Sequence, residues 1–168
     1  MNFVIFQTKW GYFGLAGSDN NIYRSFLPTS EPDLIKKCFH KEFPSAKFDK
    51  NFFLSLQKQI IAYFKGKIID FNTDIAVSLN GFGDFAKRVL LTCQKIKFGQ
   101  KTTYKELAQK AGYSNASRAV GNVLAKNPIP LIIPCHRIIR TDGKLGGFTA
   151  PGGTNLKKRL LKHEKIFF

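Results

Sequence analysis

The chain changes its pattern at residues 80–83, Asn-Gly-Phe-Gly, and this change limits the folds open to it. Before this break, apolar residues either alternate along short stretches, as in strands, or recur at helical spacing. After the break, the periodicity is helical through most of the chain. Glycine-rich breaks of this kind are typical of boundaries. We therefore predict two lobes, at residues 1–80 and 81–168, with a sheet in the first and mainly helices in the second.

The first lobe is expected to begin with a β-meander. Its short strands are predicted at residues 3–6, 12–15 and 22–26. Helices are predicted at residues 32–39 and around residues 53–64, where apolar side chains recur at helical spacing. Residues 68–71 and 75–79 are interpreted as a strand and a connector.

Composition places the chain among globular proteins. It has 168 residues, of which 43% are hydrophobic and 17 are Phe, so it can bury a core without help. No stretch is apolar for long enough to span a bilayer, and residues 1–7 lack the basic start of a signal peptide. We expect a cytoplasmic protein, or a nuclear one in a eukaryote.

The three cysteines, Cys38, Cys93 and Cys135, are odd in number and far apart. This spacing matches neither a disulfide framework nor a metal-binding pair, so reduced thiols are expected. Cys38 and Cys93 lie in apolar stretches, and we expect both in the core.

Positive charge is concentrated in the second half of a chain whose net charge is +16. Residues 1–84 contain 10 Lys and Arg against 8 Asp and Glu, whereas residues 85–168 contain 17 against 3. Such asymmetry indicates a polyanionic partner and binding that weakens with salt. The alternative is a lysine-rich surface that serves solubility alone.

A helix-turn-helix is predicted in the second lobe, after a helix over residues 85–96. Thr103 and Glu106 have the spacing of a capping box, which starts a helix that runs to residue 111. Gly112 supplies a left-handed turn residue, and Ser114 can cap the next helix, at residues 116–126. The buried stripe of this second helix is expected to be Ala116, Ala119, Val120, Val123 and Leu124.

The exposed face of that second helix carries small side chains and one long one, Arg118. Such a face could approach a duplex closely with Arg118 as its probe. A face of small residues can equally pack against another helix. The residues concerned are Ser117, Arg118, Gly121 and Asn122.

Residues 134–139, Pro-Cys-His-Arg-Ile-Ile, place the thiol of Cys135 beside the imidazole of His136. A histidine that accepts or relays the thiol proton converts cysteine into a nucleophile at neutral pH. Glu164 could orient the imidazole as the third member of a relay, or could be an ordinary solvated charge. Asn127 precedes a proline-rich segment that is too stiff to be a linker, and its side chain could brace this bend or belong to a simple turn.

Residues 134–139 are similar to the Pro-Cys-His-Arg-Val signature of the O6-alkylguanine-DNA alkyltransferases. Further matching elements stand in the family's order at residues 103–108, 117–121, 127–128, 146 and 163–164. The resemblance covers residues 82–166. It implies an α+β protein with a small amino-terminal RNase H-like β-sheet lobe with helices, and a helical carboxy-terminal lobe containing a winged-helix-like helix-turn-helix.

The resemblance also implies an activity, the irreversible transfer of an alkyl group from O6-alkylguanine in double-stranded DNA to Cys135. Arg118 would enter the base stack from the minor groove and replace the extruded nucleotide. Tyr104 would donate a proton toward N3 of the guanine, while His136, backed by Glu164, would help form the thiolate. Each molecule would act once, as a monomer, with no metal or organic cofactor, and O4-alkylthymine is a further candidate substrate.

The remaining site residues follow from the same resemblance. Asn127 would brace the bend beneath the site. The other expected DNA contacts are Ser117, Gly121, Asn122, Thr103 and Arg137, and the expected pocket residues are Ile138, Gly146, Phe148 and Thr149. Phe148 stands where many relatives have tyrosine, and the zinc ligands of some relatives have no counterpart here.

Three other functions fit parts of the pattern. Alkyltransferase-like proteins bind lesions without chemistry, but they replace the cysteine that is present here as Cys135. A helix-turn-helix regulator would need one preferred DNA sequence. A cysteine hydrolase would turn over with excess substrate.

Overall fold

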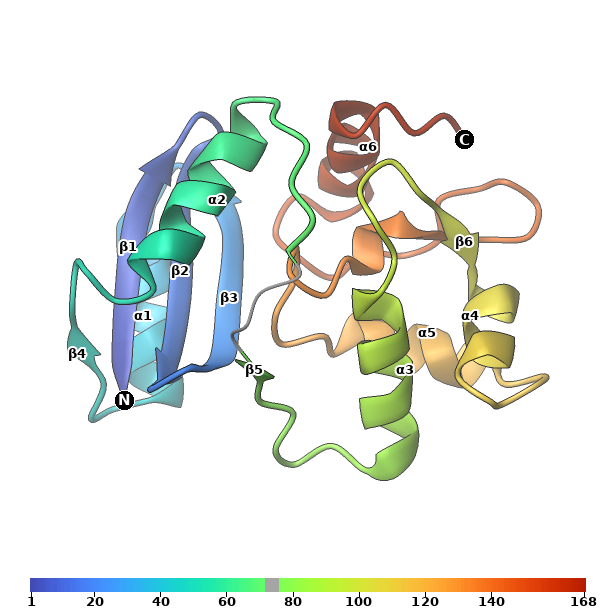
Figure 1. Ribbon diagram of the computed structural model, residues 1–168, viewed down its shortest axis with the longest axis horizontal. Coiled ribbons are helices and arrows are strands. Elements are labelled where there is room, and N and C mark those ends of the chain that lie inside the picture. The colour runs from blue at the N-terminus through green and yellow to red at the C-terminus, as the bar shows by residue number, and fades with distance from the viewer. Residues whose placement is uncertain (72–75) are drawn as a thin grey trace. The chain divides into compact units, whose positions relative to one another are not determined.

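The computed structural model describes residues 1–71 and 76–168 (Figure 1). It divides into two compact units, Met1–Ser78 and Leu79–Phe168, which we call the first unit and the second unit. The structure is a mixture of sheet and helices, which makes it an α+β protein as predicted. Ile75, the start of one predicted segment, lies outside the described residues.

A five-stranded sheet forms the centre of the first unit, and its three long strands form the predicted meander. These strands are β1 (Asn2–Thr8), β2 (Gly11–Ser18) and β3 (Asn21–Thr29), and each pairs antiparallel with the next. Two short strands, β4 (Lys47–Phe48) and β5 (Ala76–Val77), extend the sheet in parallel to β1 and β3. The strand order is therefore β4-β1-β2-β3-β5.

Helices α1 (Pro32–Glu42) and α2 (Leu54–Phe64) cover opposite faces of this sheet (Figure 1). The ring of Phe13 lies 6.2 Å from that of Phe64 in α2. Side chains alternate between faces along a strand, so the next residue, Gly14, faces the other way. A Cβ atom at Gly14 would lie 2.5 Å from Ile35 in α1, so only glycine allows α1 to approach this closely. Both faces of β2 are buried as a result.

Two predictions for the first unit need correction. Residues 68–71 form no regular strand: Ile68 is 77% exposed and Phe71 is buried against Tyr63, but neither sheet of the described residues pairs with this stretch. Cys38 is only partly buried, because it lies to the side of the apolar face of α1 that contains Ile35 and Phe39.

The second unit consists of helices around a small two-stranded sheet. Its elements are α3 (Asp84–Gln94), β6 (Thr102–Thr103), α4 (Tyr104–Lys110), α5 (Ser117–Ala125), the 3-10 helix η1 (Cys135–Arg137), β7 (Ile138–Ile139) and α6 (Gly153–His163). Strands β6 and β7 pair in parallel. No helix within the described residues is both long enough and apolar enough to span a membrane.

The predicted capping box begins α4. The Thr103 hydroxyl oxygen accepts a hydrogen bond from the Glu106 amide at 3.1 Å, and the Glu106 carboxylate accepts one from the Thr103 amide at 2.8 Å. Gly112 follows α4 with φ of +85°, as predicted for the turn residue. Strand β6 therefore passes directly into α4, and Tyr104 becomes the first residue of that helix.

Helix α5 differs from its prediction in two respects. Its N-cap is Ala116, without a side-chain cap, and not Ser114, because the helix begins later than expected. Ala119 is exposed, whereas Val120 and Leu124 are buried, so the apolar stripe is narrower than predicted.

Candidate active site

Cys135 is the first residue of η1, and a rigid segment holds it in place. The Asn127 side-chain amide donates hydrogen bonds to the Ile133 carbonyl at 2.8 Å and to Cys135 Sγ at 3.2 Å. The Asn127 side-chain oxygen accepts one from the Ile129 amide at 3.0 Å. Asn127 thus ties both ends of the proline-rich segment together and contacts the sulfur directly.

Cys135 lines a cavity of about 360 Å³ in the second unit. Cys135 itself is only 7% exposed, so a reacting group must enter the cavity to reach it. The cavity is bounded by α4, α5, η1 and the glycine-rich loop that precedes α6. Its lining residues are Tyr104, Ser117, Gly121, Leu124, Ala125, Cys135, Arg140, Gly146, Gly147, Phe148 and Thr149.

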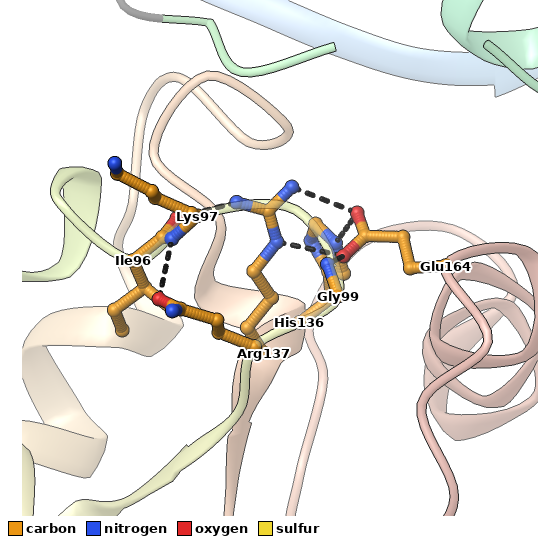
Figure 2. Close-up of polar contacts among 7 residues, drawn as sticks. Ile96, Lys97, Gly99, His136, Arg137 and Glu164 are labelled. Carbon is orange, nitrogen blue, oxygen red and sulfur yellow. Dashed lines mark hydrogen bonds and ion pairs between the residues drawn. The ribbon is translucent and has the colours of Figure 1, made fainter. Parts of the chain in front are cut away.

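The Glu164 carboxylate is buried, and four N–H donors surround it (Figure 2). His136 Nε2 lies 2.9 Å from Oε1, and Arg137 contacts both oxygens through Nη2 at 2.9 Å and Nε at 2.8 Å. The Gly99 amide contributes a longer contact of 3.4 Å. Burial alone would raise the pKa of Glu164, but His136 and Arg137 hold it well below its usual range.

His136 is neutral in this arrangement. Burial lowers the pKa of the imidazole, and this effect outweighs the opposite influence of the hydrogen bond and charge of Glu164. A neutral imidazole beside an ionised carboxylate donates its Nε2 proton to that carboxylate. The other ring nitrogen, Nδ1, therefore keeps a lone pair that can accept a proton.

The thiol of Cys135 is protonated at rest. Burial raises its pKa, while the Asn127 hydrogen bond and the positive charge of Lys157 act in the opposite direction. Forming the thiolate therefore requires a proton acceptor and stabilisation of the negative charge. His136 can supply the first, and the Asn127 amide supplies part of the second.

Tyr104 and Gly146 meet at one side of the cavity. Gly146 has φ of +72°, and a Cβ atom there would lie 2.8 Å from the Tyr104 hydroxyl, so only glycine fits. Burial raises the pKa of Tyr104, which therefore keeps its proton at neutral pH and can donate it. The Thr149 hydroxyl donates a hydrogen bond of 2.8 Å to the Ala125 carbonyl and so attaches the loop to the end of α5.

The predicted DNA-contacting residues are found in different surroundings. Arg118 and Asn122 are exposed on α5, whereas Ser117 and Gly121 line the cavity. The hydroxyl oxygen of Thr103 caps α4. The expected DNA contact by Arg137 is wrong, because this side chain is 3% exposed and binds Glu164 and the Ile96 carbonyl (Figure 2).

Lys157 is a site residue that we did not predict. Its side chain is fully buried, and Nζ donates a hydrogen bond of 2.6 Å to the carbonyl of Ile138. The signal was its position in α6, where Lys157, Leu160, Leu161 and Glu164 have the spacing of a buried helical face. Among the residues that the structure describes, no cluster of three or more His, Cys, Asp or Glu is arranged to hold a metal ion.

Comparisons with known proteins point to one family. Residues 84–166 match the family model described as 6-O-methylguanine DNA methyltransferase, DNA binding domain. The chain is 36% identical over 166 residues to the methylated-DNA–protein-cysteine methyltransferase of Methanosarcina barkeri, covering 98% of each chain. It is 40% identical over 138 residues to that of Metallosphaera sedula, covering 82% of this chain and 84% of the relative.

Solved structures are similar over nearly the whole chain. The crystal structure of Mycobacterium tuberculosis OGT in complex with DNA has a TM-score of 0.81 and 30% identity, and the match covers 98% of this chain and 93% of that one. A crystal structure of the Mycobacterium tuberculosis O6-methylguanine methyltransferase has a TM-score of 0.77 and 32% identity.

Proposed function

The chain belongs to the family of the methylated-DNA–protein-cysteine methyltransferases, and from this premise we propose how its residues repair DNA. The protein is a DNA-binding methyltransferase that repairs DNA by direct reversal. Cys135 is the acceptor, and it takes the alkyl group from O6-alkylguanine. The observation that carries this assignment is the cavity lined by both Cys135 and Tyr104, with the neutral His136 and ionised Glu164 adjoining it.

The transfer is a single displacement at the alkyl carbon. The thiol proton passes to Nδ1 of His136 through a water molecule, and the imidazolium that forms is stabilised by Glu164. Cys135 Sγ then forms a bond to the alkyl carbon as the bond from that carbon to guanine O6 breaks. Tyr104 donates its proton toward N3 of the leaving guanine. The product is a thioether, which no neighbouring group can hydrolyse, so each molecule reacts once.

The guanine reaches the cavity by rotation out of the duplex. Arg118 occupies the space left in the base stack, while the small residues Ser117 and Gly121 let α5 approach the minor groove. Asn122 and Thr103 add contacts to the DNA. The exposure of Arg118 next to a cavity that is lined by Ser117 and Gly121 supports this arrangement.

The pocket roles belong to the same proposal. Backbone groups of Cys135 and Ile138 recognise the guanine edge, and the Thr149 amide approaches O6. Gly146 leaves space beside Tyr104, and Phe148 provides an apolar wall. Because Phe148 has no hydroxyl, this wall holds the base by contact and not by hydrogen bonding.

We assign an RNase H-like fold to residues 1–80 and a winged-helix-like helix-turn-helix to residues 81–168, which bind DNA and accept the alkyl group. The antiparallel β1-β2-β3 meander with parallel β5 and the α4-turn-α5 pair support these assignments. The protein acts as a monomer, without metal or organic cofactor, in the cytoplasm, or in the nucleus of a eukaryote.

A duplex that contains O6-methylguanine tests the proposed function. We expect the tryptic peptide of residues 127–137 to gain one methyl group at Cys135, in an amount equal to the protein, after which the reaction stops. Cys135→Ser should abolish transfer, and Cys38→Ser, which changes a thiol in the first unit, should leave it unchanged. Continued turnover would indicate a hydrolase, and tight lesion binding without methylation a non-catalytic binding protein. Either result would overturn the assignment.

A further inference from the structure

Lys157 is a buried cation without a carboxylate partner. Lysine is almost never fully buried unless its charge is paired, yet Lys157 is 0% exposed. The salt bridges within the described residues do not include it, and its hydrogen bond goes to a neutral acceptor, the Ile138 carbonyl. Burying this charge costs free energy that the hydrogen bond alone does not explain.

The position of Lys157 connects it to both reacting side chains. Its Nζ atom lies 5.7 Å from the centroid of the Tyr104 ring. Its acceptor, Ile138, donates its amide to the Cys135 carbonyl and so closes the 3-10 turn that carries the nucleophile. Burial lowers the pKa of Lys157 to about 8, against the attraction of Cys135 and Cys93, which raises it. The ammonium form is thus still present at neutral pH.

The other groups around this site cannot supply the same charge. His136 is neutral until it accepts the thiol proton, and the positive charge of Arg137 is matched by Glu164. Cys93 in α3 is buried, and burial raises its pKa well above the usual value, so it remains a thiol. The titratable and charged groups around the site are Cys93, Tyr104, Cys135, His136, Arg137, Arg140, Lys157 and Glu164. Arg140 also lines the cavity, but its side chain is exposed and its charge is matched by Asp142 at 3.0 Å.

We propose that Lys157 is the counter-ion of the Cys135 thiolate, a positioning residue that stabilises the nucleophile from its place between the Ile138 carbonyl and the Tyr104 ring. This inference rests on the proposed function, because the thiolate of Cys135 is needed there as the nucleophile. The charge of Lys157 explains how the buried sulfur becomes anionic before the attack. It assigns proton removal to His136 and charge stabilisation to Lys157.

The inference can be tested without DNA by the reactivity of Cys135 toward iodoacetamide. The reaction is measured as a function of pH from the mass of the tryptic peptide of residues 127–137. Lys157→Met keeps the length and apolar stem of the side chain but removes its charge. We expect this variant to shift the midpoint of reactivity upward by about one pH unit, which is about a tenfold loss of rate below the midpoint. Lys157→Arg should restore part of the loss, and Lys158→Met, an exposed neighbour in α6, should have no effect.

An unchanged midpoint in folded Lys157→Met would overturn the inference. If that variant does not fold, the coupling can be measured from the other side, because two interacting charges affect each other equally. Cys135→Ser should then lower the pKa of the Lys157 ammonium, which can be measured by nitrogen NMR of this buried group. An unchanged pKa would again overturn the inference. Failure of methyl transfer in the unmodified protein would refute the proposed function instead.

Discussion

The two units bury very different side chains. In the first unit, the buried polar residues are neutral, namely Thr8, Ser25 and Gln57, and aromatic contacts such as Phe13 with Phe64 fill the core. In the second unit, four ionisable side chains are buried between residues 136 and 164, namely His136, Arg137, Lys157 and Glu164. Among the described residues, all the buried ionisable side chains other than thiols and Tyr63 belong to this group.

This difference separates a unit built for stability from one that contains chemistry. Buried charges seldom add net stability, because desolvation offsets their attraction. Apolar residues of similar size would serve a core equally well. The second unit keeps its charges next to Cys135, where they control protons and the negative charge on sulfur.

Of the substitutions considered, replacing Glu164 should lower the stability of the second unit most. Glu164→Gln leaves the Arg137 guanidinium buried without a counter-charge, which costs about 3–5 kcal/mol. We expect the loss in urea unfolding followed by far-UV circular dichroism, to which the helices of the second unit contribute more residues than α1 and α2 of the first. Fluorescence of Trp10, the single tryptophan, reports the first unit and should change little.

Glu42→Gln is the matched control for that variant. Glu42 pairs with Arg24 at 3.2 Å in the first unit, and both side chains are partly exposed. Such pairs contribute about 0–1 kcal/mol. If Glu164→Gln cost no more than Glu42→Gln, the buried carboxylate would not support the second unit.

Acid should weaken the second unit before the first. The pKa of His136 is lowered in the folded chain, so below about pH 6.5 the unfolded chain binds a proton that the folded chain does not. The free energy of unfolding therefore decreases as the pH is lowered below this value. The lowered pKa of Glu164 has the same effect below about pH 4.5. Each group can contribute up to about 1.4 kcal/mol per pH unit. Urea titrations from neutral to acid pH measure this slope, and His136→Gln should reduce its upper part; an unchanged slope would contradict the assignment.

Arg118→Ala should have the smallest effect on stability and a selective effect on activity. The side chain is exposed on α5, so we expect a change within about 0.5 kcal/mol. Single-turnover repair of a duplex should slow by about tenfold or more, while reaction with free O6-methylguanine base should change little. Lys126→Ala, an exposed cation at the end of α5, is the control. Equal losses of rate with the duplex and with the free base would show that Arg118 does not extrude the nucleotide.

Local patterns in the sequence predicted the local structure well. The meander, the capping box of Thr103 and Glu106, and the turn at Gly112 depend on residues close together in sequence, and all three were confirmed. The two-residue strands β4 and β5 were not predicted, because they depend on pairing with β1 and β3. A pair of residues carries too little periodicity to indicate a strand.

Long-range partners account for the errors at the site. Arg137 looked like a DNA contact because it is basic, but its guanidinium meets a carboxylate 27 residues away in the sequence. Lys157 was overlooked because a lysine is ordinarily assigned to the surface. The grouping of Cys135, His136 and Glu164 was anticipated only through the resemblance to a family, since spacing alone also fitted a solvated Glu164.

The Glu164 carboxylate also acts as a cross-link. It joins α6 to η1 and, through the amide of Gly99, to a loop 65 residues earlier in the chain. Secreted proteins commonly fasten such distant segments with disulfides. All three cysteines here are free, and an ionic clasp requires no oxidant. The second unit must keep the sulfur of Cys135 reduced for its reaction, and its distant segments are linked by ion pairs and hydrogen bonds that do not involve sulfur.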